Sequence, residues 1–155
     1  PLLIKMAKEI ETVKCFKIEC AQAASKLRKL VVEGGDAIEG PFDGEEGITL
    51  FADLEAGATG NMSSAMIPDL IRPVVLDYLD AEFDKSEEKY NNILPLINYE
   101  NRQCGFRATK VIMKEGGVIN SDFCRHPIPP LEEQTKAGLI KLVKKYDPIA
   151  LSWGK

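Results

Sequence analysis

The segment VKCFKIECAQAASKLRKLVVEGG, residues 13–35, contains a strand pattern followed directly by a helix pattern. In its first part successive residues point to opposite sides of the chain. One side carries Val13, Cys15, Lys17 and Glu19, and the other carries Lys14, Phe16 and Ile18. The aromatic and β-branched content favours a strand. The second part is rich in Ala, Leu and Lys, and Gly34-Gly35 is a typical helix stop. A strand followed by a helix is the beginning of a βαβ unit.

Strand and helix patterns keep alternating on both sides of this segment. Helical patterns cover residues 1–11, 45–56 and a stretch from about 67, and short strand patterns cover residues 36–40 and 57–64. In the helix over 45–56 we expect the inward side chains to be Ile48, Phe51, Ala52 and Leu54. The alternation predicts three parallel strands with helices packed against them.

After about residue 83 the strand patterns stop. Helical patterns cover residues 85–100, 107–117 and 131–147, and a proline-rich connector, RHPIPPL (125–131), joins the last two. We therefore expect an α/β part over residues 1–83 and a helical part over residues 84–155.

Composition excludes several classes of protein. The 155 residues carry 20 Lys+Arg against 24 Asp+Glu, and 45% of them are hydrophobic, as in globular proteins. The acidic balance favours neither nucleic acid nor anionic membrane as a partner. No apolar run approaches the ~20 residues that span a bilayer, and no secretory signal is recognisable. The four cysteines lack CxxC spacing, which indicates reduced thiols in a cytoplasmic protein.

Lys17 is the most informative residue. Because Phe16 and Ile18 face the helices, Lys17 faces the other side of the sheet. A lysine on a buried strand is disfavoured unless it is paired or functional. Burial favours the neutral amine, which is a nucleophile toward carbonyl groups. Glu19 shares this face and is either an ion-pair partner or a proton-transfer group. Two interpretations stay open: a Lys–Glu pair that reaches solvent, or Schiff-base chemistry.

Other candidate sites give weaker signals. The segment GATGNMSS lacks the spacing of phosphate-binding loops. Asp43, Glu45 and Glu46 could bind a hard cation, but acidic residues ahead of a helix are also favoured by its N-terminus. The single histidine, His126, lies in the connector and is expected to be an ordinary loop residue. We predict no metal site.

Three strands do not complete a parallel sheet. Parallel strands are normally covered on both faces, and the helices here can cover only one. We expect another polypeptide segment to cover the inner face. Residue 1 is a proline without an initiator methionine, so we expect the chain to begin inside a longer protein.

The order of these motifs resembles the dihydrodipicolinate synthase/N-acetylneuraminate lyase family. The resemblance rests on FKIE with Lys17, GGDAIEGPFDGEE, LEAGATGNMSSAMIPD and RHPIPPL, and it extends over the C-terminal half of the family pattern. Within the family the motifs are most similar to those of 2-keto-3-deoxy-L-arabonate dehydratases.

The resemblance implies a fold and an assembly. The family fold is a (β/α)8 TIM barrel followed by a helical extension, usually assembled as a tetramer. This chain would supply about three strands, the sixth to the eighth, and the N-terminal half would come from the same parent chain or from a companion chain. Three of eight strands cannot close a barrel.

The resemblance also implies the chemistry. Lys17 occupies the position of the lysine that forms an imine with a 2-keto acid substrate, so no metal or organic cofactor is needed. Gly40, Met62 and Ser63 are expected to contact the substrate, and Glu19 is assigned to acid–base work from its place on the strand. The expected reaction is dehydration of 2-keto-3-deoxy-L-arabonate. The alternatives are a pyruvate-dependent aldolase or synthase, and an inactive half-barrel with a role in assembly.

Overall fold

The computed structural model describes all residues from 1 to 155, and they form two compact units. The first, here called the sheet unit, contains Pro1–Ser63 and Val74–Glu87. The second, the helical unit, contains Ser64–Pro73 and Glu88–Lys155. The expected division of the chain at residue 83 into a barrel part and a helical part stays a prediction. No helix is long and apolar enough to cross a membrane.

The sheet unit contains the three predicted parallel strands, in the order β1-β2-β3. They are β1 (Cys15–Ile18), β2 (Gly40–Asp43) and β3 (Gly60–Asn61). In the register, Lys17 lies opposite Phe42, and Phe42 lies opposite Gly60. The next row is Ile18, Asp43 and Asn61. Because successive residues of a strand point to opposite faces, these two rows lie on opposite faces of the sheet.

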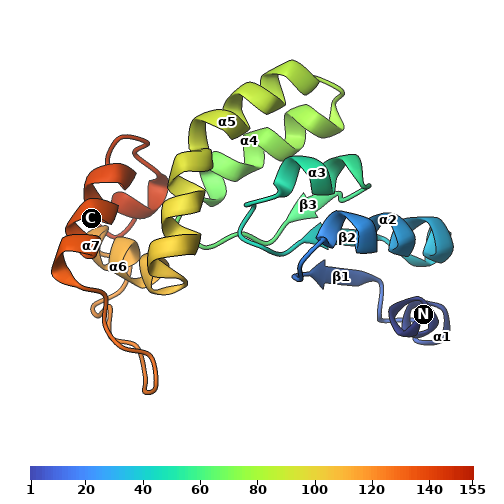
Figure 1. The fold of residues 1–155 in the computed structure, drawn as a ribbon, viewed down its shortest axis with the longest axis horizontal. Coiled ribbons are helices and arrows are strands. Elements are labelled where there is room, and N and C mark those ends of the chain that lie inside the picture. The colour runs from blue at the N-terminus through green and yellow to red at the C-terminus, as the bar shows by residue number, and fades with distance from the viewer. The chain divides into compact units, whose positions relative to one another are not determined.

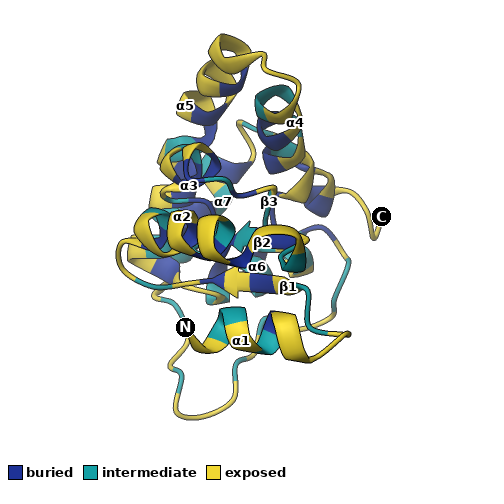
Figure 2. Cartoon of the chain, turned by 90° about the vertical axis from the view of Figure 1, so that its right-hand side faces the viewer, coloured by how far each residue is buried: buried dark blue, intermediate teal, exposed yellow.

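Helices cover one face of this sheet. Helix α2 (Ala23–Gly34) packs against β1 and β2, and helix α3 (Leu50–Glu55) packs against β2, whereas helix α1 (Leu2–Glu9) packs against α2 (Figure 1). Along β1, Phe16 and Ile18 are buried whereas Cys15 and Lys17 are exposed (Figure 2). This alternation confirms the predicted orientation, in which Lys17 lies on the face away from the helices.

Two predicted elements of the sheet unit were placed wrongly. The second strand begins at Gly40 and not at residue 36, because α2 ends at Gly34, Gly35 has a positive φ of 53°, and a short 3-10 helix, Gly35–Ala37, follows. The helix expected from residue 45 begins at Leu50. Residues Glu46 and Gly47 have φ values of 50° and 86°, which are incompatible with an α-helix.

The helical unit confirms the predicted helical patterns. The helices are α4 (Pro68–Leu79), α5 (Phe83–Tyr99), α6 (Arg107–Glu115) and α7 (Glu133–Val143). Both α4 and α5 contribute residues to the two units. Helix α6 packs against α7, and Ile112, Leu139 and Val143 are fully buried there. Their burial drives the pairing of the two amphipathic helices.

Candidate active site

Lys17 lies at the carboxyl end of β1, and its side chain forms an ion pair with Glu19. Lys17 Nζ is 2.9 Å from Glu19 Oε2, and the two side chains are 38% and 52% exposed. The Lys17 side chain is therefore not buried as expected, because no helix of the sheet unit covers this face of the sheet. An exposed pair of this kind stabilises a fold by at most about 1 kcal/mol. The pair also places a carboxylate beside the amine.

Gly44 forms a wall against the Lys17 side chain. A Cβ atom at Gly44 would lie 2.8 Å from Lys17 Cγ and 2.9 Å from Lys17 Cε. It would also lie 2.9 Å from the carbonyl oxygen of Ile18. Only glycine lets the chain leave β2 this close to the lysine. Gly44 was not among the predicted site residues, although a glycine at a strand is a known sign of close backbone approach.

Two of the predicted substrate-binding residues lie at the same edge of the sheet as Lys17. Met62 and Ser63 directly follow β3, and the carboxyl ends of parallel strands meet at one edge. The Met62 backbone N–H donates to the carbonyl oxygen of Asp43 at 2.9 Å, and the Met62 residue is 41% exposed. In (β/α)8 enzymes this edge carries the active site. The substrate contacts assigned to Met62 and Ser63 stay predictions.

Gly40 is placed differently. It is the first residue of β2 and lies opposite Cys15, so it belongs to the amino end of the strand. A Cβ atom on it would meet the Phe42 ring and Cys15 Sγ within 2.7 Å. The β2 residue that lies beside Lys17 is Phe42, which sequence reasoning did not single out. The role of Gly40 in substrate binding stays a prediction.

A buried polar cluster lies on the helix-covered face, behind the carboxyl edge. Asp43 and Asp53 are both fully buried. Asp43 Oδ2 accepts a hydrogen bond from the Asn61 amide, and Asp53 Oδ2 accepts one from the Thr49 hydroxyl at 2.7 Å. Burial, and secondarily the nearby Asp53 carboxylate, raise the pKa of Asp43 to about 7. Ala52 was expected to face inward, but it is exposed, and the neighbouring Asp53 is buried instead.

The acidic residues proposed as cation ligands do not come together. No group of three or more His, Cys, Asp or Glu side chains is arranged to hold a metal ion. Asp43 is buried among Asn61 and Asp53, whereas Glu45 and Glu46 lie half-buried in the turn that follows. All four cysteines are free thiols.

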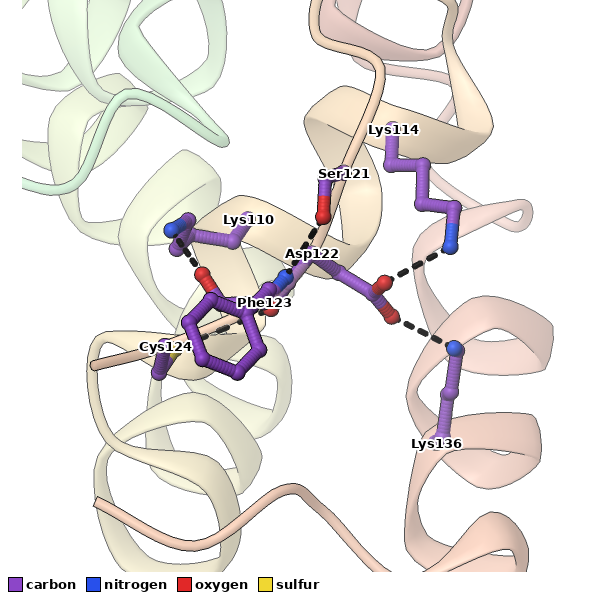
Figure 3. Close-up of polar contacts among 7 residues, drawn as sticks. All are labelled: Lys110, Lys114, Ser121, Asp122, Phe123, Cys124 and Lys136. Carbon is purple, nitrogen blue, oxygen red and sulfur yellow. Dashed lines mark hydrogen bonds and ion pairs between the residues drawn. The ribbon is translucent and has the colours of Figure 1, made fainter. Parts of the chain in front are cut away.

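A cavity of about 600 Å³ lies in the helical unit, and Lys17 does not line it. Its wall is the loop between α6 and α7, including His126 and the prolines that follow. Asp122 fixes this loop by accepting from Lys114 at 2.6 Å and from Lys136 at 2.5 Å (Figure 3). These two ammonium groups hold the pKa of Asp122 far below its usual range. Lys110 also donates to the Phe123 carbonyl oxygen.

Asp122→Ala is expected to loosen this loop. The change removes two charge-assisted hydrogen bonds that join the loop to α6 and α7, so the free energy of unfolding should fall by about 1 kcal/mol. Limited proteolysis should cut between residues 117 and 131 several-fold faster. Glu132→Ala, an exposed carboxylate at the end of the same loop, is the matched control and should change neither quantity. Equal cleavage rates for the two variants would contradict the assignment.

The fold of the chain agrees with comparisons to known proteins. The chain matches the Dihydrodipicolinate synthetase family over residues 3–146, and it belongs to that family. It is 52% identical over 153 residues to L-2-keto-3-deoxyarabonate dehydratase from Azospirillum brasilense, an alignment that covers 99% of this chain and 50% of that protein. The chain therefore spans about half the length of this relative.

Solved structures give the same result for the fold. Dihydrodipicolinate synthase from Aquifex aeolicus superposes with a TM-score of 0.81 at 20% identity, covering 94% of this chain and 49% of that one. The enzyme from Rhodopseudomonas palustris superposes with a TM-score of 0.71 at 25% identity, covering 83% of this chain and 44% of that one. The α/β fold with three parallel strands is thus shared with these proteins.

Proposed function

We propose that the chain is the lysine-bearing half of a Schiff-base-forming hydro-lyase that dehydrates 2-keto-3-deoxy-L-arabonate. One observation carries the proposal: Lys17 stands at the carboxyl edge of a parallel sheet, beside a carboxylate, on the face that no helix of the sheet unit covers. The 52% identity to a dehydratase supports the choice of substrate.

The proposed reaction begins at the Lys17 amine. The amine attacks the C2 carbonyl of the substrate and water leaves, which gives a protonated imine. The imine withdraws electrons from C3, so a proton leaves C3 and an enamine forms. The enamine expels the C4 hydroxyl group as water. C5 and its hydroxyl group then each lose a proton while C3 and C4 each gain one, and hydrolysis of the imine releases 2-ketoglutarate semialdehyde. The lysine supplies the electron sink, so the reaction uses neither a metal nor an organic cofactor.

The remaining strands of the barrel would complete the site. Neither β1 nor β3 pairs with a further strand of this chain on its outer side. The N-terminal half of the barrel, from the same parent chain or a companion chain, would pair with these strands and cover the face that carries Lys17. That cover would remove water from the Lys17–Glu19 pair, which favours the neutral amine. A tetramer is the proposed assembly of the complete barrel.

Borohydride trapping tests the imine. The complete protein is incubated with 2-keto-3-deoxy-L-arabonate or pyruvate and reduced, and its peptides are then analysed by mass spectrometry. We expect the reduced adduct on the peptide that carries Lys17, and none on Lys14, a lysine three residues away with its own carboxylate partner, Glu39. No adduct at Lys17 in the complete assembly contradicts the proposal.

Product analysis separates the dehydratase from a pyruvate-dependent aldolase. The dehydratase converts 2-keto-3-deoxy-L-arabonate into the semialdehyde without carbon–carbon cleavage. An aldolase would release pyruvate from its substrate. Release of pyruvate, with no semialdehyde, would replace the proposed reaction by the aldol reaction while keeping the role of Lys17.

Glu19→Gln is expected to separate imine formation from proton transfer. The amide keeps a polar contact with Lys17 but cannot take up a proton, so dehydration should slow by about 10²-fold or more. Trapping of pyruvate should fall much less, because the amine is retained. Steady-state kinetics and the trapping rate measure the two effects. Equal losses in both would show that Glu19 only orients Lys17.

A further inference from the structure

The carboxyl groups of Asp43 and Asp53 form a buried pair that the proposed reaction does not use. Both residues are fully buried, and the two carboxyl groups are within hydrogen-bonding reach of each other. Asp43 Oδ1 accepts from the backbone N–H of Glu45 at 3.3 Å, and its Oδ2 accepts from the Asn61 amide. Asp53 Oδ2 accepts from Thr49, but Asp53 Oδ1 receives no N–H or O–H donor from the chain.

No cation compensates this pair. The buried face of α2, which packs against β2, is apolar, and its lysines and arginine lie on the exposed side. From β1 the neighbour of Asp43 is Ile18, since Lys17 and Glu19 face the opposite side of the sheet. From β3 the neighbour is Asn61, and α3 contributes Asp53, with Glu55 exposed. The turn after β2 contributes two half-buried carboxylates, Glu45 and Glu46.

Two buried carboxylates side by side without a cation are unstable unless one of them carries a proton. We infer that Asp43 carries this proton and donates it to the Asp53 carboxylate, and that the resulting pair holds the turn after β2 in place against Lys17. The orphaned Asp53 Oδ1 is the acceptor position that such a proton would fill. Asp43 and Asp53 are then positioning residues, because neither of them touches the reacting atoms.

The link from the pair to Lys17 is short. Gly44, which forms the wall against the Lys17 side chain, directly follows Asp43. The hydrogen bond from the Glu45 N–H to Asp43 fixes the other end of the same turn. The Asp43 carbonyl oxygen also accepts from Met62 N–H at 2.9 Å. A displacement of Asp43 would therefore move Gly44 and Met62 together, and both lie at the edge of the sheet that carries Lys17.

The sign of the pH dependence follows from the position of the proton. The pKa of Asp43 is about 7 in the folded protein, and its ordinary value is 3.8. Between about pH 4 and about pH 7 the folded state therefore keeps a proton that the unfolded chain has lost. The free energy of unfolding should therefore fall as pH rises from about 4 to about 7, and then level off. At pH 8 about one-tenth of the molecules would keep the proton on Asp43.

Asp53→Asn tests the inference. The inference rests on the proposed function only where it concerns the reaction of Lys17 with the substrate. The amide oxygen keeps the bond from Thr49, and the amide N–H supplies a permanent donor to Asp43. We expect the loss of thermal stability between pH 5 and pH 8 to be smaller in the variant than in the unaltered protein. The borohydride trapping rate of the variant is also divided by that of the unaltered protein at each pH. We expect this ratio to rise by up to about tenfold between pH 6 and pH 8.

Asp80→Asn, an exposed carboxylate of the sheet unit, is the control and should leave both profiles unchanged. If Asp53→Asn lowers stability and trapping equally at every pH, or does not fold, the pair has no proton-dependent positioning role and the inference is overturned. If the unaltered protein forms no adduct at all, the proposed function fails, and the melting profiles still decide whether the pair holds a proton.

Discussion

Lys17→Arg is expected to abolish turnover, with a loss of about 10⁴-fold or more in kcat. Arginine is permanently charged and cannot act as the nucleophile that forms the imine, so no electron sink develops at C2. Removal of a covalent nucleophile commonly costs this much or more. The guanidinium can keep the ion pair with Glu19, which contributes at most about 1 kcal/mol at its present exposure, so the fold should survive. Steady-state kinetics on the complete assembly and urea unfolding measure the two effects.

The matched control is Lys14→Arg. Lys14 precedes the same strand, and its Nζ lies 3.8 Å from Glu39 Oε1, so the substitution changes the same group in a similar surrounding. It should leave kcat within about twofold, because Lys14 lies off the face that carries Lys17. Substantial turnover by the Lys17→Arg protein, or equal losses in the two variants, would remove the lysine from the mechanism.

The features that sequence reasoning predicted correctly are those fixed by local pattern. The alternation around Phe16 and Ile18 requires those two side chains to be buried together, and this determines the direction of Lys17. The helix stop at Gly34-Gly35 was predicted because glycine readily adopts a positive φ, as Gly35 does. The family membership, expected from the order of the motifs, is also confirmed.

Other features depend on tertiary contacts that a local pattern does not contain. Asp53 is buried beside the Asp43 carboxyl group of β2 and accepts a hydrogen bond from Thr49, whereas an isolated helix pattern assigns an aspartate to the exposed face. One signal was present: Asp53 is three residues after Leu50, within the buried stripe of α3. The exposure of Lys17 depends on which segments cover the sheet, and these segments lie outside the strand that carries Lys17.

Gly44→Ala is expected to lower kcat by about 10²-fold. The φ angle of Gly44 lies outside the left-handed region, so alanine is tolerated by the backbone itself. Its methyl group would lie 2.8 Å from Lys17 Cγ and 2.9 Å from the Ile18 carbonyl oxygen, so the lysine side chain or the turn must move. A displacement of a reacting group by about 1 Å can cost about 10²-fold in rate. Kinetics and trapping measure this effect.

Gly138→Ala provides the comparison. Its methyl group would lie 2.5 Å from the Tyr99 hydroxyl oxygen, so it crowds a side chain of the helical unit and does not touch Lys17. Both variants should lose about 1–3 kcal/mol of unfolding free energy from overpacking. Only Gly44→Ala should also slow imine trapping. If the rate of trapping falls in both variants in proportion to the loss of unfolding free energy, Gly44 is merely a packing residue. If trapping falls in Gly44→Ala alone, the wall that the turn after β2 places against the amine controls its reactivity.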